Sequence, residues 1–248
     1  DLFGSGIGGL AMIGLCWFIY PVSLPALISI LPVLGGLLIL PREDYKKAFV
    51  PALLALALPL YLFLDPPALP ASQYKSISGA MNLPGARIVE ERPSPYGHVQ
   101  VLRADALRYA PGLSLSFTGS IPVRDVIFAN GEWFGPVIAW TRSDSSHFLN
   151  FTTNALPYIT GKPRRVLILD AGTGLFAAHA LSQGAESVTQ TEHNLVAVDL
   201  LKHDLAGMID SLFTLPGVNT VGIDSRSYLL QDKSKYDLIV LPTIETFG

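Results

Sequence analysis

The sequence predicts a helical membrane region followed by an α/β protein, in which a small antiparallel β domain precedes a truncated, Rossmann-like doubly wound sheet. Three observations lead to this fold class. The first forty or so residues are almost free of charge, short alternating apolar runs follow, and from residue 164 buried strands alternate with helical patterns. Strict alternation is typical of half-buried strands, whereas strand and helix in alternation are typical of parallel α/β sheets.

Composition narrows the class of protein. Of the 248 residues, 50% are hydrophobic and 15% are charged, against about 25% charged residues in an average soluble domain. The net charge of -3 leaves no basic footprint, so we expect no nucleic-acid partner. The single cysteine, Cys16, and the scattered histidines exclude a disulfide framework and the usual zinc motifs, so we expect no metal.

The N-terminal region, residues 1–65, is predicted to cross a membrane. Residues 2–41 contain no Asp, Glu, Lys, Arg or His, and roughly 20 apolar residues suffice for one span. Breaks at Pro21 and Pro25, and at the charged loop 42–47, give helices near 3–20, 23–40 and 48–64. A signal peptide has one apolar run rather than three, and buried helices of a soluble protein are disfavoured by the long charge-free stretch.

The topology and partners of this region are less constrained. Three Lys or Arg residues in loop 42–47 favour a cytoplasmic loop, which would place the rest of the chain outside. The chain starts with Asp1 rather than Met, and we expect further helices upstream that would reset the orientation, so the side stays open. Gly4, Gly6, Gly8 and Gly9 would let another helix approach closely. We therefore expect a membrane protein with other membrane subunits or a second copy as partners.

A proline-rich linker, residues 66–71, leads into a predicted antiparallel β domain with a helix, residues 72–160. Asn130-Gly131 between two apolar runs is typical of a type I′ hairpin, because both positions need positive φ. We expect a helix over 145–157. The predicted strands are 86–91, 98–103, 113–117, 126–129 and 133–138.

Residues 161–248 are predicted to form the Rossmann-like domain. Its expected strands are 166–169, 187–192, 218–223 and 236–241, and its expected helices are 175–183 and 195–209. Sheets of this class usually contain more strands than these four, so we expect the domain to be incomplete at its C-terminal end.

Polar residues at successive strand ends predict a nucleoside pocket. Asp170-x-Gly172-x-Gly174 forms a strand-to-helix turn, Glu192 ends the next strand, and Asp224-Ser225 ends the third. Glycines admit a ligand to the backbone, and an acid about 20 residues later binds ribose hydroxyls in such folds. In the alternative interpretation, Glu192 and Asp224 are helix N-caps or solvated loop acids.

The part after residue 72 resembles the polyamine aminopropyltransferases, the spermidine and spermine synthases, and more closely their membrane-fused bacterial relatives. The stretches that carry the resemblance are 94–99 (SPYGHV), 110–115 (APGLSL), 130–133 (NGEW), 155–158 (ALPY) and 169–174 (LDAGTG). The resemblance implies a bacterial inner-membrane location and, in active members, transfer of an aminopropyl group from decarboxylated S-adenosylmethionine to an amine. A carboxylate near that amine acts as the base.

Several positions depart from the family pattern. Pro242 stands where the catalytic aspartate is expected, and Thr173 replaces the second aspartate of the glycine turn. The family's Tyr-Gln pair near the nucleoside becomes Tyr96-Gly97, and its polyamine-contacting Tyr-His-Glu run aligns with residues 149–151. Glu245 is the remaining candidate base; otherwise it is a surface acid of the loop.

Three hypotheses follow. The chain is a catalytically degenerate relative that serves as a structural or regulatory subunit of a membrane assembly. Alternatively, it is an active aminopropyl- or other S-adenosylmethionine-type transferase, or a nucleoside or polyamine sensor in a transporter-like protein. Its possible ligands are decarboxylated S-adenosylmethionine, S-adenosylmethionine and methylthioadenosine. The predicted binding residues are Asp170, Gly172, Gly174, Glu192, Asp224 and Ser225.

Overall fold

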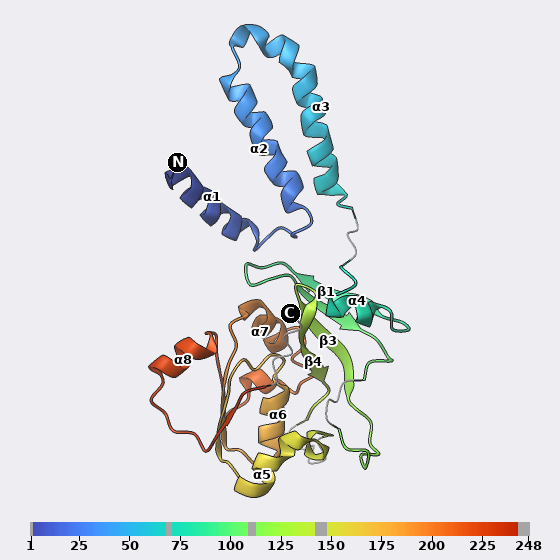
Figure 1. The fold of residues 1–248 in the computed structure, drawn as a ribbon, viewed down its shortest axis with the longest axis vertical. Coiled ribbons are helices and arrows are strands. Elements are labelled where there is room, and N and C mark those ends of the chain that lie inside the picture. The colour runs from blue at the N-terminus through green and yellow to red at the C-terminus, as the bar shows by residue number, and fades with distance from the viewer. Residues whose placement is uncertain (1, 68–70, 109–112, 142–147, 243–248) are drawn as a thin grey trace. The chain divides into compact units, whose positions relative to one another are not determined.

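The computed structural model describes residues 2–67, 71–108, 113–141 and 148–242 (Figure 1). The chain divides into two compact units. The helical unit comprises residues 1–72 and 92–98, and the α/β unit comprises residues 73–91 and 99–248. The chain therefore passes between the two units three times.

The helical unit contains three apolar helices: α1 (Leu2–Leu15), α2 (Leu24–Ile39) and α3 (Tyr45–Leu64), with a 3-10 turn, η1 (Arg42–Asp44), before α3. Helices α2 and α3 pack side by side. Helix α3, with 20 residues, is long and apolar enough to cross a membrane, whereas α1 and α2 have 14 and 16 residues. The expected first helix ends early, because residues 16–19 form turns ahead of Pro21, which disfavours helical geometry at Tyr20.

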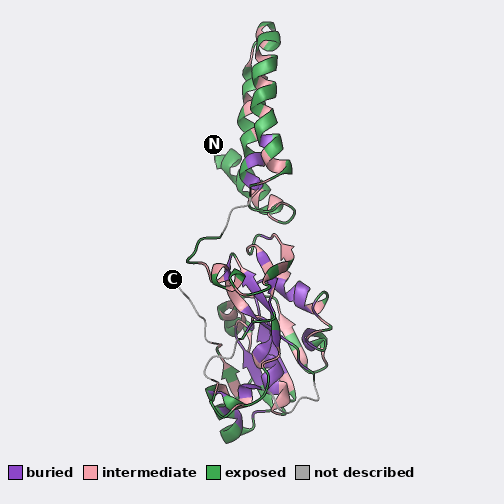
Figure 2. Cartoon of the chain, turned by 90° about the vertical axis from the view of Figure 1, so that its right-hand side faces the viewer, coloured by how far each residue is buried: buried purple, intermediate pink, exposed green. Residues whose placement is uncertain are grey.

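Few side chains are buried inside the helical unit. Among its described residues, the buried ones are Ser23, Leu24, Ala26, Pro59 and Ser94. The helices are exposed along most of their length (Figure 2). Apolar surface of this extent is typical of a membrane or protein contact rather than of a surface in water.

The α/β unit begins with α4 (Ser76–Met81) and a four-stranded sheet. Its strands are β1 (Arg87–Arg92), β2 (Val99–Arg103), β3 (Val123–Ala129) and β4 (Glu132–Ile138), in the order β1-β2-β3-β4. Strand β3 pairs antiparallel with both β2 and β4. Asn130 and Gly131 have φ angles of 54° and 77°, which confirms the predicted hairpin turn.

Two predicted elements of this region are wrong. Residues 113–117 form a turn instead of a strand, because the Ser116 amide bonds the Ser114 hydroxyl and the Phe117 amide bonds the Ser114 carbonyl. Of the helix expected over 145–157, the described part consists of η2 (Phe148–Phe151), η3 (Thr153–Ala155) and the start of α5 (Leu156–Gly161). The Thr152 hydroxyl accepts from the Asn154 amide, and such local bonds compete with a continuous helix.

The second sheet has the predicted strand and helix alternation. Its elements are β5 (Arg165–Ile168), α6 (Leu175–Ser182), β6 (Ser187–Thr191), α7 (Leu195–Lys202), η4 (Leu212–Thr214), β7 (Val218–Val221), α8 (Ser225–Gln231) and β8 (Leu238–Val240). The strands are parallel in the order β7-β6-β5-β8. Helix α7 stops at Lys202 rather than at Ile209, because the Leu205 amide bonds the Leu200 carbonyl and closes the last turn.

One hydrophobic cluster joins the two sheets of the α/β unit. It includes Val101 and Ile127 of the antiparallel sheet, and Val166 and Ile168 of the parallel sheet, all fully buried. The buried residues of both sheets are visible as the purple interior of Figure 2. The shared cluster fixes β4 against α6 and thereby positions the turn between β5 and α6.

Candidate functional site

The carboxyl ends of β5, β6 and β7 meet in a hydroxyl and carboxylate cluster formed by Asp170, Thr191 and Ser225. The Ser225 hydroxyl donates to Asp170 Oδ1 at 2.8 Å and accepts from the Asp170 amide at 3.0 Å. The hydroxyls of Thr191 and Ser225 are 2.7 Å apart. Since the only hydroxyl proton of Ser225 goes to Asp170, Thr191 is the donor in that bond.

Asp170 has a strained backbone at this cluster. Its φ of 52° lies in the left-handed region, which a non-glycine residue occupies only when its surroundings hold it there. Besides Ser225, the Thr191 hydroxyl also accepts from the Asp170 amide, at 3.2 Å. The sequence analysis did not include Thr191 in the site. The available signal was its position, because it is a hydroxyl residue at the end of β6, which lies between β5 and β7.

Glu192 is buried and bonded to the backbone on both sides. Only 2% of its surface is exposed. Oε2 accepts the Gly172 amide at 2.9 Å, and Oε1 accepts the Asn194 amide at 2.9 Å. Burial raises the pKa of this carboxyl above its ordinary value, while the two amide bonds and His193 act in the opposite direction. In this structure, Glu192 ties the glycine turn to the end of β6.

The glycines of the turn pack against protein atoms. A Cβ on Gly172 (φ 56°) would lie 3.0 Å from the Phe134 carbonyl oxygen. A Cβ on Gly174 (φ 82°) would lie 2.8 Å from Phe213 Cε2 and 2.9 Å from Leu212 Cδ2. The packing of the turn against β4 and η4 therefore explains why both positions need glycine.

Thr173, between these glycines, is equally enclosed. It is 3% exposed, and its hydroxyl donates to the Pro136 carbonyl at 2.6 Å. The position that the resemblance assigns to a second aspartate is thus filled by a small side chain with a satisfied donor.

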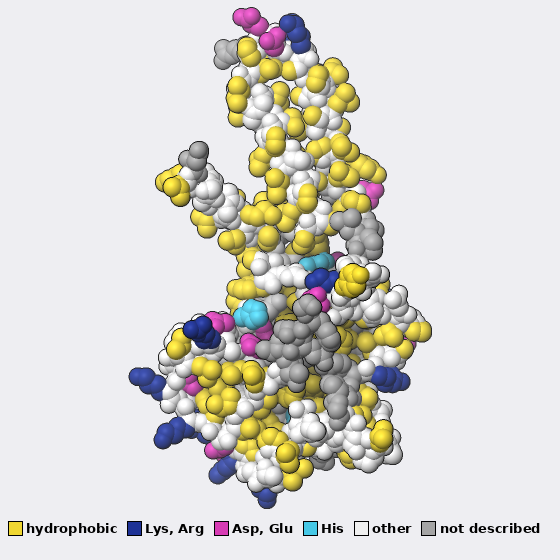
Figure 3. Space-filling model, in the orientation of Figure 1, with side chains coloured by type: hydrophobic (Ala, Val, Ile, Leu, Met, Phe, Trp, Pro, Cys, Tyr) yellow, Lys and Arg dark blue, Asp and Glu magenta, His cyan; other side chains and the backbone are white. Residues whose placement is uncertain are grey.

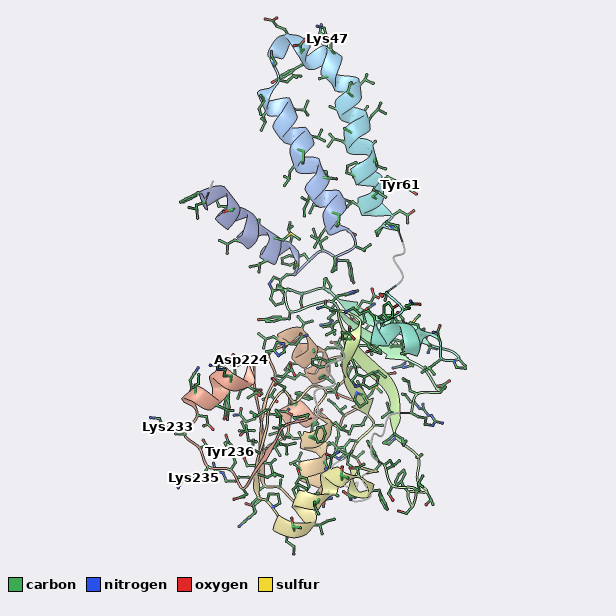
Figure 4. The ribbon with its side chains drawn as sticks, in the orientation of Figure 1. Lys47, Tyr61, Asp224, Lys233, Lys235 and Tyr236 are labelled. Carbon is green, nitrogen blue, oxygen red and sulfur yellow. The ribbon has the colours of Figure 1, made fainter. Side chains whose placement is uncertain are left out.

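Asp224 stands at the start of α8, exposed to solvent (Figure 4). Its Oδ1 accepts the Ser227 amide at 3.0 Å, which is the geometry of a helix N-cap. The bond with Ser227 lowers the pKa of Asp224. Glu192, by contrast, is not a cap: Asn194 caps α7 by accepting the Ala197 amide at 3.2 Å.

Residues 149–151, which the resemblance aligns with an acceptor-contacting run, have neighbours within the α/β unit. Leu149 is 2% exposed, and Asn150 Oδ1 accepts from Gln183 Nε2 at 2.7 Å and lies 3.0 Å from His179 Nε2. The ring of Phe151 is 5.0 Å from that of Phe117. Pro242 follows β8 closely, and Glu245 lies outside the described residues.

Two cavities border described residues of the α/β unit. One, of about 390 Å³, is bordered by Phe117, Trp140 and Phe148 and has no charged lining residue, whereas the other, of about 730 Å³, includes Asp105, Arg108 and Arg124. None of the predicted binding residues lines either cavity. The guanidinium groups of Arg108 and Arg124 make the larger cavity unsuited to a cationic polyamine. For metals, the described residues contain no cluster of three His, Cys, Asp or Glu side chains.

Comparisons with known proteins find partial likeness only. No family model and no curated protein matches the sequence. Among solved structures, the chain is similar to a spermidine synthase in complex with the transition state analogue AdoDATO and to the spermidine synthase from Thermotoga maritima. Both are 14% identical over 62% of this chain, with a TM-score of 0.44.

The chain covers 47% and 46% of those two proteins, so it spans less than half of their length. At that identity and TM-score, the similarity carries no conclusion about the activity of this chain.

Proposed function

We propose that this chain is a membrane-anchored relative of the spermidine synthases that has lost transferase activity and serves as a structural or regulatory subunit of a membrane assembly. One observation carries the proposal. The carboxylate expected to bind ribose, that of Glu192, is 2% exposed and accepts two backbone amides at 2.9 Å. A ribose would have to open a bonded, buried group before it could bind there.

The acceptor side supports the same proposal. Aminopropyl transfer requires a carboxylate that takes a proton from the attacking amine and attracts its cationic form. Pro242 has no such group, and Leu149 and Phe151 are apolar. Loss of the base together with loss of the cation-attracting side chains favours a protein that does not catalyse the reaction.

Anchoring is supported by α3, which is long and apolar enough to span a membrane, and by the exposed apolar surface of α1 and α2. A protein held in a membrane by several helices and without its own chemistry would act by contact with neighbours. The expected neighbours are other membrane subunits or a second copy of the chain.

One observation favours the active alternative. Asp170 has a strained φ of 52° at a hydroxyl-lined strand end, and backbone strain of this kind is concentrated at functional sites. A S-adenosylmethionine-type ligand at this cluster would give that strain a role.

An activity measurement separates the two. The full chain in detergent is incubated with decarboxylated S-adenosylmethionine and a diamine or spermidine, and release of methylthioadenosine is followed beside an active spermidine synthase in the same detergent. We expect no release above the rate without protein. Release above that rate would overturn the proposal, and its loss in Glu245→Gln would assign the base to Glu245.

A further inference from the structure

Within the helical unit, two aromatic pairs join the segment 92–98 to the turn between α1 and α2. The ring of Tyr96 lies 5.9 Å from that of Trp17 at 84°, and the ring of Tyr20 lies 5.7 Å from that of His98 at 79°. Both pairs have the edge-to-face arrangement that aromatic rings prefer. The connection between β1 and β2 therefore belongs structurally with the turn between α1 and α2.

The two ends of the α2 and α3 pair differ in chemistry. Lys47 lies at the end where the two helices are joined, near Asp44 and Lys46, and Tyr61 lies toward the other end of α3 (Figure 4). Figure 3 shows hydrophobic side chains along the helices and charged ones at the joined end.

Because a short turn joins α2 to α3 and the two helices pack together, the start of α2 and the end of α3 lie at the same end of the pair. That end therefore has Trp17 and Tyr20, which precede α2, and Tyr61, whose hydroxyl lies 3.5 Å from Asp65 Oδ2. The joined end has Asp44, Lys46 and Lys47 beside Tyr45, whereas the other end has three aromatic residues, Trp17, Tyr20 and Tyr61, beside the single acid Asp65.

The aromatic side chains at this end are half exposed. The exposed fractions are 43% for Trp17, 41% for Tyr20 and 40% for Tyr96. Tryptophan and tyrosine with an apolar body and a polar edge are enriched where a bilayer meets water. Half-exposed rings beside long apolar helices fit that boundary better than either pure water or the hydrocarbon core.

We propose that residues 92–98 form a membrane-interface contact, with Tyr96 at the level of the lipid headgroups beside Trp17 and Tyr20. This inference rests on the membrane anchoring in the proposed function. It adds a second attachment of the α/β unit to the bilayer, besides the linker after α3. The partner is the headgroup layer of the lipid bilayer.

The same contact bears on the nucleoside site. The resemblance aligns Tyr96-Gly97 with a pair that lies near the nucleoside in the family. Here the Tyr96 ring packs on Trp17 in the helical unit. A residue engaged at the membrane interface is not available to a nucleoside, which agrees with the proposed loss of the site.

Fluorescence quenching in lipid nanodiscs tests the contact on the full chain. Cys16 is the only cysteine, so Cys16→Ser gives a background in which one introduced cysteine takes an environment-sensitive dye. Pro95→Cys reports on the segment and keeps Tyr96. Leu115→Cys, at a fully exposed position of the α/β unit, is the matched control. Leu54→Cys, 67% exposed on α3, reports insertion of the helices.

We expect a headgroup-attached nitroxide to quench the dye at position 95 several-fold more than the dye at position 115. An acyl-chain nitroxide should quench the dye at position 54. Adding Tyr96→Asp should lower quenching at position 95 to the level of position 115, whereas Tyr96→Phe, which keeps the ring, should leave it unchanged.

The outcomes separate the two proposals. Equal quenching at 95 and 115, with position 54 quenched, overturns the interface contact and leaves membrane anchoring intact. An unquenched dye at position 54 overturns membrane anchoring and the contact with it.

Discussion

The two units use the same apolar residues in opposite ways. In the helical unit, Leu54 of α3 is 67% exposed, and most of the large apolar side chains of α3 are exposed as well. In the α/β unit, Leu167 of β5 is 0% exposed. The α/β unit encloses its apolar surface in one cluster, as a chain folded in water does. The helical unit leaves that surface outside, which indicates that lipid or a partner, and not its own core, provides the burial.

The largest expected effect is a matched pair of leucine truncations. Leu167→Ala should lower the free energy of unfolding by about 2–5 kcal/mol, because a buried leucine leaves both lost contacts and a cavity. Leu54→Ala should change it by less than about 0.5 kcal/mol in detergent, since an exposed side chain has no packed site to empty. Urea unfolding in detergent measures both, followed by the fluorescence of Trp133 and Trp140 for the α/β unit and, in a variant with these two replaced by Phe, of Trp17 for the helical unit. Equal losses would contradict the difference between the units.

Two glycines with positive φ test whether packing closes the turn between β5 and α6. Gly174→Ala should lower the free energy of unfolding by about 3 kcal/mol, because it combines a φ of 82° with a Cβ less than 3 Å from Phe213 and Leu212. Gly184→Ala shares a positive φ, 88°, but has no atom within 4 Å of the added Cβ. Its cost should be smaller by the crowding component alone. If the two unfold alike in urea, the turn is not closed by packing.

Placing at position 173 the aspartate that the resemblance to the aminopropyltransferases implies should not create a nucleoside site. Thr173→Asp should lower the free energy of unfolding by about 1–3 kcal/mol, because it removes a buried donor and places a carboxylate against the Pro136 carbonyl. Thr173→Ser keeps the donor and should cost less. Thermal unfolding measures stability, and a gain of methylthioadenosine binding in Thr173→Asp would show that only this residue had been missing.

The smallest effect is a pH dependence at Glu192. Burial raises its pKa in the folded protein above 4.5, its ordinary value, so the folded state holds the proton more tightly than the unfolded one. The stability from this group is therefore greatest below the unfolded pKa and falls as pH rises through the folded pKa. As pH rises over that range, the wild type should therefore lose unfolding free energy relative to Glu192→Gln. A difference independent of pH would contradict the burial of an ionising Glu192.

The strands could be predicted where local pattern and tertiary burial agree. The buried run before Asp170 and the Asn130-Gly131 hairpin are of this kind, since their signals are local. Residues 113–117 alternate like a strand, yet Leu115 is exposed and serine hydroxyls bond the local backbone. The sequence predicts a helix as far as residue 209, whereas α7 ends at Lys202, because Leu205 and Ile209 are buried in the turns that follow the helix.

The sequence predicts where the candidate site residues lie in the fold, but not which atoms each of them binds. The sequence placed Asp170, Glu192 and Ser225 at neighbouring strand ends, where the structure has them. That Glu192 meets the Gly172 amide depends on the exact path of the turn against β4, which no local pattern encodes. For Asp224 the cap was one of two interpretations, and its use by nucleoside remains a prediction.

The central claim is that the strand-end carboxylates stabilise the fold and hold no nucleoside. Calorimetric titration of the detergent-solubilised chain with S-adenosylmethionine, its decarboxylated form and methylthioadenosine tests this most directly. Asp224→Ala is the matched variant, because this residue is exposed and its loss removes only a helix cap. The account predicts no heat of binding for any of the three ligands. Micromolar binding to the wild type that is lost in a folded Asp224→Ala protein would contradict it.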